Sequence, residues 1–130
     1  MNQTFTKDER LCRKLLISKL FREGNSFYIH PFRVLFMFEV IPVDFPVQLL
    51  ISVPKQNLKK AVDRNKIKRR ISEAWRINKH ILYEQLTERQ RQMAVSIIYT
   101  ASEILPSYQI REKIILILLR LREGHAKITG

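Results

Sequence analysis

The sequence predicts a single α+β domain in which helices cover mainly one face of a mixed sheet. Three observations lead to this prediction. The 130 residues suffice for one domain with a hydrophobic core but are few for two. The spacing of apolar residues gives the order helix, two or three strands, helix, strand, helix. The strand–helix–strand part requires a parallel pair beside the antiparallel strands, because a crossover through a helix joins parallel strands.

The N-terminal segment is predicted to be helical over residues 7–23, either continuous or broken once. Thr6 and Glu9 have the spacing of a capping box, in which a hydroxyl and a carboxylate each accept a hydrogen bond from an amide of the first turn. Leucines recur at helical spacing until Gly24, which is expected to end the helix. Cys12 is the single cysteine, and we expect it to be a small core residue rather than a nucleophile.

Two stretches of alternating apolar residues then predict strands, residues 27–41 and residues 47–53. Both faces of the first stretch are apolar, and its beginning, residues 27–30, is a candidate for a separate strand. Pro42, Asp44 and Pro46 mark a turn between the two stretches, so we expect them to pair as an antiparallel meander. One face of the sheet should meet the helices, which leaves the other face free to form a groove.

The next stretch is basic and amphipathic. Between Lys55 and Lys79 the chain has ten lysines and arginines but two acidic residues, so this fifth of the chain carries two thirds of the net charge of +12. From Ile67 onward the apolar residues occupy about a third of a helical wheel, which predicts a helix that packs on one side and presents a basic side. Residues 56–65 do not follow that phase. They either depart from the helix or extend past the edge of the core, and either Asn57 or Asp63 could cap the helix start.

A polar bridge over residues 83–92 is expected to follow the basic helix. A strand is then predicted over residues 93–100, and a last helix should begin at Pro106-Ser107 and end at Gly124.

No set of residues for catalysis is found in the sequence. The three histidines lie in different predicted elements, there is no second cysteine, and neither an HExxH motif nor a glycine-rich phosphate loop is present. A basic field of this size attracts polyanions such as nucleic acid or an anionic membrane, and an amphipathic basic helix favours nucleic acid. The N-terminus lacks the pattern of a secretory signal, no apolar run is long enough to span a bilayer, and a lone cysteine fits the reducing cytoplasm.

The basic segment resembles the signature of the bacterial ribonuclease P protein. VDRNKIKRRISEAWR, with the alanine before it, matches the pattern A-V-x-R-N-x-x-K-R-x-x-R-E-A-[FYW]-R at ten positions. RLCRKLLISKLFREGNSF is similar to the N-terminal pattern of the family, and LLISVPK occupies the place of its S-V-S-K strand. The resemblance covers most of residues 5–122. Ser72 departs from it, because the family usually has arginine there, and Arg70 is expected to replace that contact. Ile17 replaces a usual groove aromatic.

This resemblance implies a fold and a division of labour. The fold is αβββαβα, with a four-stranded mixed sheet and a left-handed βαβ crossover, like the second domain of a small-subunit ribosomal protein. One RNA-binding domain would span residues 1–130, with its core at about residues 5–122 and a flexible tail at residues 124–130. The implied activity is that of ribonuclease P, which removes the 5′ leader of precursor tRNA. An RNA subunit would cleave with Mg²⁺ held mainly by RNA and substrate, and the protein would supply no catalytic residue and no metal ligand.

The resemblance also assigns RNA contacts to particular residues. The basic helix would face the catalytic RNA, and the sheet groove would hold the single-stranded leader through stacking and electrostatic attraction. The residues expected to bind the catalytic RNA are Lys60, Arg64, Asn65, Lys66, Lys68, Arg69, Arg70 and Arg76. Those expected to bind the leader are Lys14, Phe21, Tyr28 and Phe36. Arg64 and Asn65 are expected to be exposed.

The partners implied are thus the catalytic RNA and precursor tRNA, with no membrane and no required protein partner. The competing interpretation is a stand-alone RNA-binding or ribosomal-type protein with no role in cleavage, which would share the basic helix and the lack of catalytic residues. A protein-only nuclease is disfavoured because its acidic residues would have to cluster around metal ions, and here they are scattered.

Overall fold

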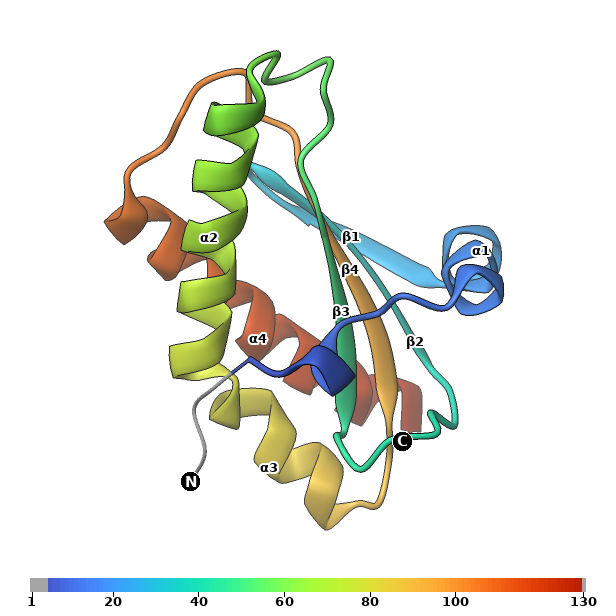
Figure 1. The fold of residues 1–130 in the computed structure, drawn as a ribbon. Coiled ribbons are helices and arrows are strands. Elements are labelled where there is room, and N and C mark those ends of the chain that lie inside the picture. The colour runs from blue at the N-terminus through green and yellow to red at the C-terminus, as the bar shows by residue number, and fades with distance from the viewer. Residues whose placement is uncertain (1–4, 130) are drawn as a thin grey trace.

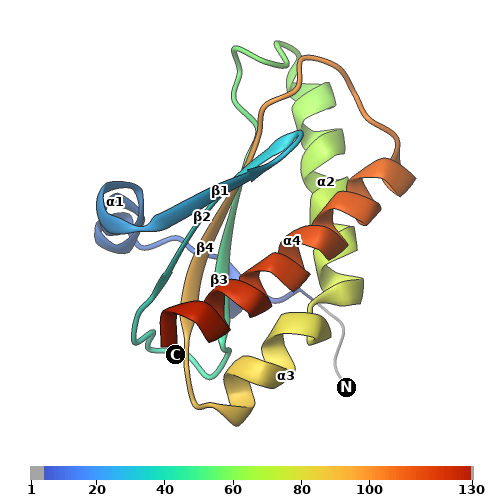
Figure 2. The same ribbon diagram turned by 180° about the vertical axis from the view of Figure 1, so that it is seen from behind.

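The structure, a computed structural model, describes the backbone of residues 5–129 and the side chains of residues 5–123. A four-stranded sheet lies between α1 on one side and the other three α-helices on the other side (Figures 1 and 2). We call these sides the α1 face and the core face. The elements in chain order are the 3₁₀ helix η1 (Lys7–Glu9), α1 (Lys14–Glu23), β1 (Asn25–Ile29), β2 (Phe32–Phe38), β3 (Val47–Ser52), α2 (Ala61–Asn78), α3 (His80–Glu88), β4 (Met93–Tyr99) and α4 (Ser107–Thr129).

The strand order in the sheet is β1-β2-β4-β3. β2 pairs antiparallel with both β1 and β4, whereas β3 pairs parallel with β4. The predicted parallel pair is therefore confirmed, but the predicted meander of the 27–41 and 47–53 strands is wrong, because β4 lies between them. The side chain of Gln92, the residue just before β4, ties the connection from β2 to β3 to the start of β4. Its amide oxygen accepts from the Ile41 amide, and its amide nitrogen donates to the carbonyls of Val43 and Phe45.

The alternation of side chains along the strands places the core as predicted. Val34 of β2 and Val95 of β4 point to the core face, where they pack in one cluster with Trp75 of α2 and with residues of α3 and α4. Leu35 points to the α1 face and packs in a smaller cluster with Leu16 of α1. Because burying apolar surface from water drives this packing, the sheet is stabilised from both sides, although α1 covers its face only in part (Figure 1).

The predicted helix over residues 7–23 is broken once. A turn of 3₁₀ helix ends at Glu9, and α1 begins at Lys14. Between them the chain is extended, since the Leu11 amide donates to the Leu49 carbonyl at 2.9 Å and forms a bridge to the edge of β3. Cys12 lies in this extended stretch and is exposed, so its predicted place in the core is wrong.

Two other boundaries differ from the prediction. The expected polar bridge over residues 83–92 is largely helical, because Leu82 and Leu86 are buried one turn apart and form the packed side of α3. Two apolar residues at helical spacing are too few to predict a helix from the sequence. The expected stop at Gly124 is also wrong, since α4 continues to Thr129.

The helix α2 begins at Ala61, and neither predicted capping residue caps it. Lys60 is the N-cap residue and makes no capping bond with its side chain, while the side-chain amide of Asn57 donates to the Tyr99 carbonyl at 3.1 Å. The first buried residue of α2 is Ile67, and Val62 is 69% exposed. The first turns of α2 therefore extend past the edge of the core, which was one of the two alternatives for this segment.

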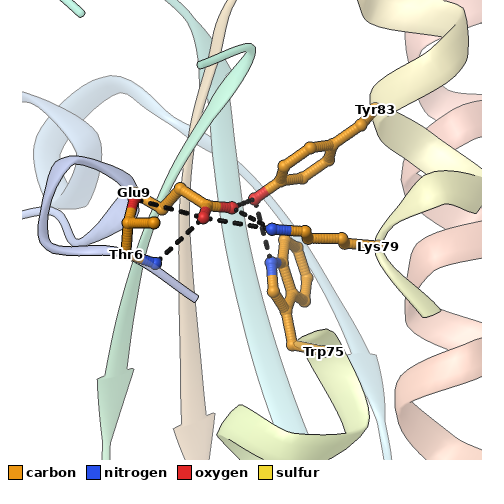
Figure 3. A network of polar contacts seen from close by, with 5 residues as sticks. All are labelled: Thr6, Glu9, Trp75, Lys79 and Tyr83. Atoms are coloured by element: carbon orange, nitrogen blue, oxygen red, sulfur yellow. Dashed lines mark hydrogen bonds and ion pairs between the residues drawn. The ribbon is translucent and has the colours of Figure 1, made fainter. Parts of the chain in front are cut away.

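A buried ion pair joins the N-terminal segment to the junction of α2 and α3 (Figure 3). Glu9 is 0% exposed and Lys79 is 5% exposed. The Lys79 ammonium lies 2.9 Å and 3.1 Å from the two carboxylate oxygens, and the Tyr83 hydroxyl donates to the same carboxylate at 2.7 Å. Trp75 donates its indole N–H to the Tyr83 oxygen at 3.2 Å. The predicted capping box is present as well, with the Thr6 amide donating to Glu9 at 3.0 Å.

This network satisfies the charges of both buried groups and removes Lys79 from the basic surface. Burial in this cluster raises the pKa of Tyr83 well above its ordinary value, so Tyr83 remains a donor to Glu9 at neutral pH. Taking one partner away from a buried ion pair leaves an uncompensated charge in a place that water does not reach, which is far more costly than losing an exposed pair.

We expect Lys79→Met to lower the free energy of unfolding by about 3 kcal/mol, because the Glu9 carboxylate loses its cation while remaining buried. Denaturant titration followed by circular dichroism measures the change. Lys19→Met is the matched control, since Lys19 pairs with Glu39 at 2.8 Å at a much more exposed site. Equal losses in the two variants would contradict a special role for the buried pair.

Candidate nucleic-acid interface

The exposed side of α2 and the segment before it carry a group of cations that we call the α2 ridge. Six of these cations make no hydrogen bond or ion pair with any residue whose side chain the structure describes, namely Lys55, Lys59, Lys60, Lys66, Lys68 and Arg69. Asn65 is exposed among them, as predicted. Because no described residue neutralises these charges, they are available to a polyanion.

Three arginines that were predicted to bind RNA make bonds within the protein. Arg64 is half-buried, and its guanidinium donates to the carbonyls of Leu58 and Lys59 at 2.9 Å and 2.8 Å. The expectation that Arg64 is freely exposed is therefore wrong. Arg70 donates to the Leu105 carbonyl at 2.5 Å, so this arginine is committed to the loop before α4 and does not replace the arginine expected at position 72.

The third of these arginines, Arg76, pairs with Glu73 one turn earlier on α2, and its Nε donates to the carboxylate at 3.1 Å. The hydrogen bond from Arg76 lowers the pKa of Glu73. This pair is exposed, so solvent screening makes it weak, and a phosphate can compete for the guanidinium.

A cavity of about 520 Å³ lies beside the ridge, between α2 and α4. Lys66, Arg69 and Arg70 line it from α2, and Arg111 lines it from α4, over an apolar floor that includes Ile77. The sequence analysis missed Arg111. Its place on a helix was predictable, but nothing local in the sequence indicates that α4 lies against α2.

A second cavity, of about 240 Å³, lies on the other side of the ridge, where Lys68 and Ser72 face the N-terminal segment. Arg10 and Cys12 line this cavity from the opposite side. The small side chain at Ser72 thus borders an open space, and Arg10 brings a guanidinium to it from a different part of the chain.

The four residues predicted to bind the leader do not lie together. Lys14 and Phe21 are exposed on α1, and Tyr28 is exposed near the other end of β1. Phe36 is 5% exposed and packs in the main cluster, with its ring edge-on to Phe27 at 5.9 Å, so its predicted role as a stacking surface is wrong. The reason is the alternation of β2, in which Leu35 takes the α1 face and Phe36 takes the core face.

Tyr28 has neighbours on the α1 face that the sequence analysis missed. Arg33 is its partner in the β1–β2 pairing and is exposed. The Tyr28 hydroxyl lies 2.9 Å from Nδ1 of His30 and 3.0 Å from the hydroxyl of Thr100. An aromatic ring beside a guanidinium is a common platform for single-stranded nucleic acid.

The described residues offer no metal centre. Among them, no three side chains of histidine, cysteine, aspartate or glutamate lie close enough to hold a metal ion. No helix in the described part of the chain is long and apolar enough to cross a membrane.

Comparisons with known proteins agree on one family. The sequence model of the family Ribonuclease P matches residues 5–121. The ribonuclease P protein component of Porphyromonas gingivalis is 34% identical over 108 residues, which cover 83% of this chain and 78% of the relative. That of Chlorobaculum tepidum is 32% identical over 105 residues, covering 74% and 68%. The RNase P protein from Thermotoga maritima has a similar structure, with a TM-score of 0.66 at 30% identity over 86% of this chain and 96% of that one.

The different roles of the arginines on α2 predict different effects on stability. We expect Arg64→Ala to lower the free energy of unfolding by about 1 kcal/mol, because the carbonyls of Leu58 and Lys59 lose their donor. Arg69→Ala and Asn65→Ala should change it by no more than about 0.5 kcal/mol, since both side chains are exposed and bond to no described residue. Denaturant titration of the three variants compares them, and an unchanged midpoint for Arg64→Ala would contradict its structural role.

Proposed function

Because the chain belongs to the ribonuclease P protein family, we propose that it serves as the protein subunit of ribonuclease P and assists the removal of the 5′ leader from precursor tRNA. The observation that carries this proposal is the α2 ridge, in which six cations have no partner within the described protein. A surface of uncompensated lysines and arginines on a rigid helix is suited to hold a folded RNA by its phosphates.

The catalytic RNA is the partner proposed for the α2 ridge. Lysines supply compact charges to phosphates, Arg69 can bind a phosphate through two parallel hydrogen bonds, and Asn65 can both donate to and accept from a base or sugar edge. The cavity that Arg69 and Arg111 line provides room of about 520 Å³ beside the ridge. Arg111 therefore joins the residues proposed for this interface, whereas Arg64 and Arg70 support its shape.

The single-stranded leader is the ligand proposed for the α1 face. Exposed rings of Phe21 and Tyr28 offer stacking surfaces, and Lys14 adds charge on α1. Stacking depends little on which base is present, so such a site accepts leaders of many sequences.

Catalysis is proposed to belong to the RNA subunit, with Mg²⁺ held mainly by RNA and substrate. The role of this chain is then to bind and position two RNA molecules and to offset the repulsion between their phosphates. A protein that supplies positive charge at their contact reduces the amount of Mg²⁺ needed to bring them together. Because both proposed partners are RNA, a cytoplasmic location is part of the proposal.

A reconstituted cleavage assay tests the proposal. We expect the protein to accelerate leader removal by the catalytic RNA at low Mg²⁺, and the triple variant Lys60→Ala, Lys68→Ala, Arg69→Ala to lose most of that stimulation. Arg122→Ala, which removes an exposed cation near the other end of α4, is the control and should behave as the wild type. A protein that binds RNA but never stimulates cleavage would instead be a stand-alone RNA-binding protein.

The salt dependence of catalytic-RNA binding reports how many phosphates are neutralised. If the six ridge cations that have no partner among the described residues each contact one phosphate, a plot of log K against log salt concentration should have a slope of about −4 to −5. The triple variant should reduce the steepness of the slope by about 2 to 3. A slope near zero in the wild-type protein would show that the ridge is not the interface.

A further inference from the structure

A chain of hydrogen bonds runs through three side chains at the end of β1 that lies away from α1. Nδ1 of His30 lies 2.9 Å from the Tyr28 hydroxyl, which lies 3.0 Å from the Thr100 hydroxyl. The Thr100 hydroxyl in turn donates to the carbonyl of Pro31 at 2.8 Å. The chain thus connects β1 and the β1–β2 turn with the residue that follows β4.

The last bond fixes the direction of the other two. A carbonyl can only accept, so the single hydroxyl proton of Thr100 is used on Pro31. Tyr28 must therefore donate its own proton to Thr100, and its oxygen must accept from His30. Nδ1 of His30 consequently carries a hydrogen whether the ring is neutral or protonated. The other ring nitrogen, Nε2, has no partner among the residues whose side chains are described, and the ring is exposed.

The surroundings of Nε2 have the features of a nucleotide site. The ring of Tyr28 is 53% exposed and makes an angle of 57° with the His30 ring at a centroid distance of 6.1 Å. Arg33 lies opposite Tyr28 on the same face, and its guanidinium has no hydrogen bond or ion pair with the described residues. A base can stack on the tyrosine while a neighbouring phosphate reaches the guanidinium.

The ligand that best fits the unpartnered Nε2 of His30 is a ribose hydroxyl. Nε2 is an acceptor in the neutral ring and a donor in the protonated ring, and a ribose 2′-hydroxyl can both donate and accept, so it meets Nε2 in either form. Every ribonucleotide has this hydroxyl, so the contact does not depend on the base. An amino group or a carbonyl on a base edge would fit one ring form and a subset of the bases.

We propose that His30 binds a ribose 2′-hydroxyl of the precursor-tRNA leader, with Tyr28 stacked on the attached base and Arg33 at a flanking phosphate. This inference rests on the proposed function, and it adds a second contact point for the leader beyond α1. The strand β1 has five residues, which span about 16 Å, so a leader held at Phe21 must extend along the strand to reach His30. Through this contact the protein discriminates RNA from DNA at this end of the α1 face.

Leaders with single 2′-deoxy substitutions test this contact in the reconstituted protein–RNA enzyme. A series of precursor tRNAs carries one deoxynucleotide at a different leader position in each. With wild-type protein, we expect one position at which the substitution weakens precursor binding about two- to tenfold, the effect of one hydrogen bond. His30→Ala should bind the all-ribose leader more weakly by a similar factor and show no further loss at that position. A leader too short to reach His30 should be bound equally well by both proteins.

Two further variants separate this role from a structural one. His80→Ala removes an exposed histidine of α3. Its precursor binding should depend on the position of the deoxynucleotide as in the wild type. Tyr28→Phe keeps a ring for stacking but removes the bond that orients His30, so it should reduce the deoxy effect while the thermal midpoint stays close to that of the wild type.

The outcomes distinguish this inference from the function on which it depends. A His30→Ala profile identical to the wild-type profile, or a wild-type enzyme that is insensitive to every single substitution, overturns the 2′-hydroxyl contact while the preference for precursor over mature tRNA remains. Equal binding of precursor and mature tRNA by the wild-type enzyme removes leader binding altogether and overturns both proposals.

Discussion

The buried ion pair between Glu9 and Lys79 is the constraint on which the arrangement of the other elements depends. It joins residues 70 positions apart at the place where α2 ends and α3 begins. From Glu9 the chain continues along the edge of β3, where Leu11 bonds to Leu49, and then turns into α1 on the opposite face of the sheet. A charge pair that water does not reach tolerates few alternative geometries, because each partner needs the other. Its position therefore relates the N-terminal segment, α1 and α2 to one another.

The basic residues of α2 and its preceding segment divide by chemistry as well as by position. Arg64 and Arg70 use their fixed arrays of N–H groups to bond carbonyls of loops, which keeps the start of α2 and the approach to α4 in place. The lysines, together with Arg69, have no such partners among the described residues and stay solvated. The number of basic residues thus overstates the size of the binding surface. Some of the arginines stabilise the scaffold on which the other basic residues are exposed.

Much of the fold could be predicted from local patterns. The alternation along β2, β3 and β4 indicated which strand residues share a face, and the basic helix packs from Ile67 onward as its periodicity indicated. The features that could not be predicted depend on contacts between residues distant in sequence. No local feature shows that β4 enters between β2 and β3, that Glu9 meets Lys79, or that the loop carbonyls occupy Arg64. Phe36 is an example: alternation along β2 puts it on the same face as Val34, and only the structure shows that this face is the packed one.

The strand order has a consequence for how the chain folds during synthesis. β4 is the last strand to be made, yet it is the partner of both β2 and β3, so these two strands have unpaired edges until residue 99 has left the ribosome. The earlier part of the chain can form one hairpin, β1–β2, and isolated hairpins are only marginally stable. Contacts of such long sequence separation form slowly, because the intervening loop must be closed first. The sheet is thus completed late, when a single strand, β4, pairs with both β2 and β3.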